Sequence, residues 1–180
     1  MELKQEKTYT EEEYEKLNHN GLVEYNDGHI ILQAAPSRIH QKIIGQLHNE
    51  IFNYLKGKSC EVYASPFNVR LNIQGSIKRV EPDISVICDK DKLNDKGCEG
   101  SPDFIIEVIS ETNKMHDYVT KVQWYKMSCV REYWIVNYKD RIVTVYSFEC
   151  DEVNQYTFSQ SVYVGIWENF KIDFNELDLS

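Results

Sequence analysis

The sequence is short of basic residues and has no long apolar run. It holds 20 Lys and Arg against 29 Asp and Glu, which gives a formal net charge of −9. Nonspecific binding to nucleic acid depends on basic surface, so this balance disfavours it. No stretch approaches the roughly 18 apolar residues of a membrane-spanning helix. The first residues also lack the apolar segment of a signal peptide. We therefore expect a cytoplasmic protein with no membrane contact.

Glycine and proline are scarce as well, with 8 and 4 residues, which argues against a fibrous or linker-rich chain. A length of 180 residues with 42% hydrophobic residues suits one domain over residues 1–180, with an N-terminal helix in residues 1–20 and a core over residues 20–175. The five cysteines are odd in number and form no CxxC pair, so zinc-knuckle spacing is absent. We expect most of them to be buried and reduced.

Cap and turn signals divide the first third of the chain. Thr10 and Glu13 form a capping box, which predicts a short helix. Asn26-Asp27-Gly28 stands between two apolar runs and predicts a hairpin over residues 22–33. Residues 37–56 keep apolar side chains at helical spacing, between a serine start and a glycine stop, and predict the clearest helix.

The rest of the chain alternates strand-like and helix-like patterns. Strands are expected over residues 61–73 with a break near Pro66, 80–88, 104–109, 132–136, 142–148 and 155–158, with a polar loop over 89–102, a helix over 114–128 and a short helix or strand over 172–177. This order predicts a single α+β (mixed α/β) domain.

Two carboxylates, Asp83 and Glu107, lie within strand-like apolar runs, where an unpaired ionised carboxylate is costly. Lys121 follows on the expected helix, and Asp117 and Tyr125 share its face at four-residue spacing. Mg²⁺ prefers hard oxygen ligands, and two acids with a lysine suffice for metal-assisted phosphodiester cleavage. Structural readings stay open: a Pro-Asp turn at Asp83 and a buried ion pair at Glu107. Lys121 could instead pair with Asp117 on the helix surface.

Basic residues gather after these acids. Residues 114–141 contain six Lys and Arg against three acids, a net charge of +3. This charge suits an anionic substrate, and a solvated helix face accounts for it equally well.

The order of these motifs resembles the PD-(D/E)XK nuclease superfamily, whose signature joins Pro-Asp, a second strand acid and a lysine. Within it, the sequence is similar to the Uma family of restriction-endonuclease-like proteins over residues 20–175. The resemblance rests on motifs spread along the chain: Glu24 before Asp27-Gly28, Pro36-Ser37 with His40, Glu81-Pro82-Asp83, Pro102-Asp103 leading into Ile106 to Ser110, Asp117, Lys121, Tyr125, and Glu132 to Val136.

The resemblance implies a restriction-endonuclease-like fold, in which a central mixed β-sheet is flanked by helices. It implies an endonuclease that hydrolyses DNA phosphodiester bonds with Mg²⁺ or Mn²⁺. Asp83 and Glu107 would hold the metal, and Lys121 and Glu24 would complete the catalytic set. Cutting both strands of a duplex would suggest a homodimer, because one active site cuts one strand.

Three further residues would lie at the edge of such a site: His40, Asp117 and Tyr125. The sequence departs from the superfamily signature at Ile109, where the strand lysine belongs, and the branch resembled here supplies its lysine from the following helix instead. It also has Cys129-Val130-Arg131 where the family tends to have Gly-Val-Pro.

Other functions and roles stay open. The net charge of −9 and the missing strand lysine favour a catalytically inactive protein that keeps the nuclease fold for binding or assembly. A third reading is a metal-dependent hydrolase of another phosphate ester. By spacing alone, Glu24 is as compatible with an exposed strand acid as with a site residue. His40 on an apolar helix face is more often a core histidine with its hydrogen bonds satisfied.

Overall fold

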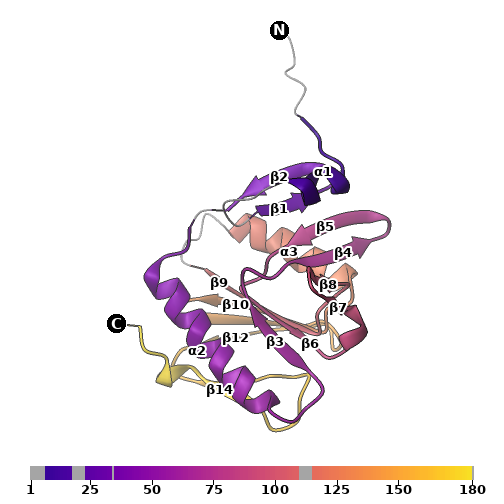
Figure 1. Cartoon of the computed structure of the whole chain (residues 1–180). Helices are drawn as coiled ribbons and strands as arrows, with labels where there is room; N and C mark the ends of the chain where they lie inside the picture. Colours follow the sequence, from indigo (N-terminus) through magenta and orange to yellow (C-terminus); the bar gives the residue numbers. More distant parts are fainter. Residues whose placement is uncertain (1–6, 18–22, 34, 110–114, 180) are drawn as a thin grey trace.

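The described part of the chain forms a mixed α+β structure of two six-stranded β-sheets, a two-stranded sheet and few helices (Figure 1). The computed structural model describes residues 7–17, 23–33, 35–109 and 115–179. The α-helices of this part are α1 (Glu11–Lys16), α2 (Arg38–Leu55) and α3 (Met115–Met127). Among these residues, no helix combines the length and the apolarity needed to cross a lipid bilayer.

The central sheet has the strand order β12-β11-β10-β9-β6-β3. β9 and β10 are parallel, and β6 pairs with β9 in the antiparallel sense. All residues of β9 and β10 are buried, which explains their nearly continuous apolar sequence. The strands of this sheet are β3 (Glu61–Ala64), β6 (Ile84–Ile87), β9 (Phe104–Ile109), β10 (Glu132–Asn137), β11 (Ile142–Ser147) and β12 (Glu152–Thr157).

Helix α2 covers one face of the central sheet (Figure 1). The hydroxyl of Ser37 caps the helix by accepting the backbone N–H of His40 at 3.2 Å. The apolar residues at helical spacing, including Ile43, Leu47 and Ile51, are fully buried against the sheet. Burying a side chain of this size is worth about 1.5–3 kcal/mol, so the packing of this face holds the helix in place.

A second six-stranded sheet packs with α3 on the opposite side of the central sheet. Its order is β2-β1-β5-β4-β8-β7. The apolar cluster between them takes Ile105 and Ile109 from β9 and Tyr125 from α3. The strands of this sheet are β1 (Val23–Asn26), β2 (His29–Leu32), β4 (Val69–Ile73), β5 (Ser76–Val80), β7 (Leu93–Asn94) and β8 (Gly97–Glu99).

The C-terminal segment packs in the same apolar cluster as α2. β13 (Ser161–Tyr163) pairs with β14 (Lys171–Asp173), and a 3-10 helix covers Phe174–Glu176. Phe158, Phe170 and Phe174 pack in the same apolar cluster as α2. The sequence predicted a short strand or helix in the tail, and both elements are present there, whereas β13 was not predicted.

Most expected elements are confirmed. Both hydrogen bonds of the Thr10–Glu13 capping box are present, and the hairpin and the helix over residues 37–56 lie where they were predicted. The break near Pro66 separates β3 from β4. The expected helix start before Lys114 lies outside the described residues.

Two expected elements are wrong in detail. The predicted strand over residues 80–88 is split, because Val80 ends β5 and β6 begins only at Ile84. Pro82 lies in this break, and a proline cannot donate to a strand ladder. The predicted loop over residues 89–102 contains a 3-10 helix over Lys90–Lys92 and the short strands β7 and β8.

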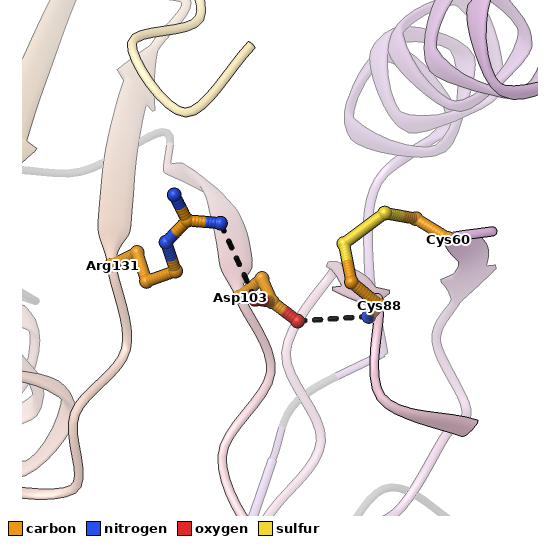
Figure 2. Close-up of a disulfide and its surroundings, with 4 residues drawn as sticks. All are labelled: Cys60, Cys88, Asp103 and Arg131. Carbon is orange, nitrogen blue, oxygen red and sulfur yellow. Dashed lines mark hydrogen bonds and ion pairs between the residues drawn. A yellow bond between two sulfur atoms is a disulfide. The ribbon is translucent and has the colours of Figure 1, made fainter. Parts of the chain in front are cut away.

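The expectation about the cysteines is also wrong. Cys60 and Cys88 form a disulfide (Figure 2). Cys129 and Cys150 are free and exposed. Glu61 pairs with Ile87 across β3 and β6, so the same register places Cys60 opposite Cys88. Figure 2 also shows Asp103, which accepts the backbone N–H of Cys88 at 2.8 Å. The disulfide therefore links the edge strand β3 to β6.

Glu132 should make the stability of the protein depend on pH. Its carboxylate accepts Trp134 Nε1–H at 2.5 Å and the backbone N–H of Ile166 at 3.2 Å. Burial raises the pKa of Glu132 from 4.5 to about 7, although these hydrogen bonds act in the opposite direction. A pKa raised on folding means that the folded chain binds the extra proton. The resulting stabilisation is fully present below the pKa of Glu132 in the unfolded chain. It is lost as the pH rises through the pKa of Glu132 in the folded chain.

We therefore expect the free energy of unfolding to fall between about pH 4.5 and about pH 8 by about 3 kcal/mol more in the wild type than in Glu132→Gln. Urea denaturation at several pH values measures this difference. Equal pH dependence in the two proteins would show that Glu132 does not titrate in this range.

Candidate active site

Glu107 lies in the middle of β9 and is 4% exposed. Alternate residues of a strand share a face, so Glu107 points to the same side as Ile105 and Ile109, toward α3 and the second sheet. Burial raises the pKa of Glu107, and the positive charge of Lys121 offsets part of that effect. A carboxylate in such a place needs a cationic or hydrogen-bonding partner.

Lys121 of α3 is this partner. Its Nζ lies 2.9 Å from Glu107 Oε1 and 2.7 Å from Glu24 Oε1. Burial alone would lower the pKa of Lys121, but the charges of Glu107 and Glu24 outweigh it and hold that pKa well above its ordinary value. The side chain is therefore a buried ammonium ion between two carboxylates.

Glu24 reaches the site from β1, 97 positions before Lys121 in the sequence. Its strand is held between β2 and β5 of the second sheet. The side chain is 5% exposed, so the reading of Glu24 as an exposed strand acid is wrong. The β1–β2 hairpin thus contributes a carboxylate that binds the same lysine as Glu107 of the central sheet.

Glu81 lies close to Glu24, and no role was predicted for it from the sequence. Burial, and after it the negative charge of Glu24, raise the pKa of Glu81 to about 7. Its Oε2 is buried and accepts no hydrogen bond from the described residues. The only signal in the sequence is its place directly before Pro82-Asp83.

Asp83 precedes β6 and lies beside the residue that follows Glu107. Its Oδ2 accepts the backbone N–H of Val108 at 2.7 Å. His40 of α2 approaches the same place, with Nε2 3.3 Å from Asp83 Oδ2 and 2.8 Å from the carbonyl oxygen of Val108. Burial acts to lower the pKa of His40, but the hydrogen bond to Asp83 and its charge raise it above 6.5.

The other candidate residues differ in their placement. Tyr125 Oη donates to Glu107 Oε1 at 3.2 Å, so its buried ring belongs to the core and its hydroxyl to the site. Asp117 belongs to α3, but its side chain lies outside the described residues. Ile109 is buried one pleat beyond Glu107 on the same face. Lys121 thus brings an ammonium group to Glu107 from the helix, while the strand has an apolar side chain at position 109.

The donor set of Asp83 and Glu107 fits a hard divalent cation. Each carboxylate has one oxygen engaged, Asp83 Oδ2 and Glu107 Oε1, and within the described part no hydrogen bond reaches the second oxygen of either. Mg²⁺ is commonly bound by one or two protein carboxylates, with water and substrate phosphate as the other ligands. Among the described residues no three or more His, Cys, Asp or Glu side chains form a metal-binding group. A cation here would therefore depend on water or substrate oxygens.

Three of the basic side chains that follow the acids are engaged within the chain. Lys121 is buried, Lys126 pairs with Asp151, and Arg131 pairs with Glu149 at 2.6 Å. These ion pairs neutralise charge within the chain. The net charge of +3 over residues 114–141 is thus no direct measure of attraction for an anionic substrate.

The fold places the chain in the class of restriction-endonuclease-like proteins. It is similar to a crystal structure described as a putative nuclease belonging to DUF820 from Anabaena variabilis ATCC 29413, with a TM-score of 0.73, 19% sequence identity, and coverage of 92% of this chain and 95% of that chain. The model of the Uma2 family, described as putative restriction endonuclease, matches residues 11–165, and the chain belongs to this family. No curated protein matches the sequence. The expected fold and family are thus confirmed.

Proposed function

We propose that the chain is an endonuclease that hydrolyses DNA phosphodiester bonds with Mg²⁺ or Mn²⁺. The observation that carries the proposal is the meeting of Glu24, Glu107 and Lys121, from three distant segments, within hydrogen-bond distance of one ammonium group. Asp83 adds a fourth charged group at the neighbouring residue of β9. Membership of the Uma2 family and likeness to a nuclease fold support the same reaction class.

In this proposal Asp83 and Glu107 would hold the metal ion. A bound Mg²⁺ or Mn²⁺ polarises the phosphate and lowers the pKa of a water molecule. Lys121 orients that water and stabilises the charge that develops on the phosphate oxygens. Glu24 holds the ammonium from the other side, and Tyr125 fixes Glu107 Oε1 so that its second oxygen stays available.

One observation favours a second candidate, a catalytically inactive protein that keeps the fold for binding or assembly. Lys121 already forms ion pairs with both Glu24 and Glu107, so these carboxylates are stabilised without a metal. Calorimetric titration with Mn²⁺ separates the two candidates. The nuclease binds Mn²⁺ through Asp83 and Glu107, whereas a scaffold shows no binding that depends on these residues.

The proposal is tested by incubating the purified protein with supercoiled plasmid and Mg²⁺ or Mn²⁺. We expect nicked circles with either ion and none with EDTA, because the carboxylates alone cannot activate water. Linear product would indicate cutting of both strands, for which we propose a homodimer. An assay with a chromogenic phosphate ester checks the remaining alternative, a hydrolase of other phosphates. Intact plasmid under all metal conditions would contradict the proposal.

A further inference from the structure

His40, Asp83 and Val108 are joined by two hydrogen bonds and one ion pair. The backbone N–H of Val108 donates to Asp83 Oδ2 at 2.7 Å. His40 Nε2 lies 2.8 Å from the carbonyl oxygen of the same residue and 3.3 Å from Asp83 Oδ2. The set joins α2, the segment before β6, and β9 at one point. It adjoins Glu107, the residue before Val108.

The sheet topology explains why this point needs a donor and an acceptor. β6 pairs with β9 from Ile84 opposite Ile106, so no residue of β6 lies opposite Val108. The backbone N–H and C=O of Val108, on this side of the buried strand β9, therefore have no partner in β6. The Asp83 carboxylate accepts its N–H but cannot donate to its C=O. A side chain from outside the sheet has to supply the second hydrogen bond, and His40 does so.

The hydrogen bonds also fix the form of His40. Both neighbours of Nε2 are acceptors, so Nε2 carries a hydrogen. Nδ1 is buried and has no hydrogen-bond partner among the described residues. The ring is therefore held through one nitrogen, at the start of a helix that the Ser37 hydroxyl caps by accepting the His40 backbone N–H. On Asp83, the Val108 N–H donor and the His40 ring both approach Oδ2, whereas no contact of either with Oδ1 is present among the described residues.

We propose that His40 is a positioning residue for the divalent cation: it orients the Asp83 carboxylate, through Oδ2 and through Val108, so that Oδ1 is presented beside Glu107. The proposal rests on the proposed function, since it takes Asp83 as a metal ligand. His40 itself touches neither the cation nor the substrate. Groups that orient a metal ligand in this way typically change metal affinity by ten- to a hundredfold when they are removed.

Three variants of His40 separate positioning from general packing. The amide nitrogen of Gln is as many bonds from Cα as His Nε2, whereas the amide of Asn is one bond shorter. The readout is the dissociation constant for Mn²⁺, measured by calorimetry without DNA. We expect His40→Ala and His40→Asn to weaken binding by about ten- to a hundredfold, and His40→Gln to stay within about threefold of the wild type. His48→Gln on the same helix is the matched control and should leave binding unchanged.

Equal Mn²⁺ affinity in His40→Ala and the wild type would overturn the proposal, and so would equal losses in the Gln and Asn variants. If His40→Ala does not fold, the comparison of Gln with Asn decides. The plasmid assay should follow the same order, with activity in the weakened variants recovering as the Mn²⁺ concentration is raised. A wild type that binds no Mn²⁺ would refute the proposed function and this inference together. Mn²⁺ binding that is unchanged by substitution of His40 would refute the inference alone.

Discussion

The variant Glu107→Gln should lose nuclease activity by about a thousandfold while it keeps its fold. A metal that polarises phosphate supplies several kcal/mol, and each 1.36 kcal/mol corresponds to a factor of ten in rate. Gln keeps the volume of Glu107 and an oxygen for the hydrogen bonds from Lys121 and Tyr125. Only the charge and one metal-binding oxygen are removed. Single-turnover nicking of supercoiled plasmid measures the rate, and calorimetry should show a matching loss of Mn²⁺ binding.

Glu132→Gln is the matched control for this experiment. Glu132 is also a buried strand glutamate whose pKa burial raises, but its partners are Trp134 and the backbone of Ile166. The control variant should retain nicking activity within a few-fold of the wild type. Full activity in Glu107→Gln would exclude Glu107 as a metal ligand. Asp83→Ala is expected to behave like Glu107→Gln, since it removes the second proposed ligand.

The second large effect is expected from Lys121→Met, which should destabilise the protein by about 3–5 kcal/mol and abolish nicking. The change leaves Glu24 and Glu107 as two buried carboxylates without their shared cation, and breaking a buried ion pair from one side costs about that much. Urea denaturation measures the loss. Lys126→Met on the same helix is the control, because Lys126 is 53% exposed and its solvent-screened pair with Asp151 should contribute little to stability.

The loss in Lys121→Met should shrink as the pH is lowered. The charge of Lys121 lowers the pKa of Glu107, so its removal raises that pKa further above 4.5. A carboxyl group whose pKa is higher in the folded than in the unfolded chain stabilises the fold at pH values below its unfolded-state pKa. This stabilisation is lost as the pH rises through its folded-state pKa. The deficit relative to the wild type should thus be smaller at about pH 5 than at about pH 8. The double variant Lys121→Met/Glu24→Gln should recover part of the stability and none of the activity. A constant deficit across this range would show that Lys121 stabilises the fold by packing rather than by charge.

Local patterns were sufficient to predict most secondary structure from the sequence. The Thr10–Glu13 capping box, the Asp27-Gly28 turn and the apolar spacing of residues 37–56 each depend on neighbours within a few positions, and each is present. The family resemblance added the arrangement of helices around a mixed sheet. Glu107 was identified as a candidate because a single acid in an apolar strand is conspicuous whatever its partner.

The partners themselves depend on tertiary structure and could not be predicted from local patterns. Lys121 contacts Glu24 rather than a helix neighbour because two sheets and α3 meet there. The Cys60–Cys88 disulfide depends on the pairing of β3 with β6, and no Cys spacing encodes that register. Glu81 was marked in the sequence only by its place before Pro82-Asp83, because its proximity to Glu24 arises in the folded chain.

The distance in sequence between Glu24 and Lys121 has a consequence for the protein during its own synthesis. At about 5–20 residues per second, the ribosome adds Lys121 roughly 5–20 s after Glu24. β10, the parallel neighbour of β9, is made later still. A nascent chain therefore carries acids without their cation, and any fragment that ends before α3 lacks the lysine altogether. Because residues are added in sequence order, the set of Glu24, Glu107 and Lys121 is incomplete until most of the chain has been synthesised.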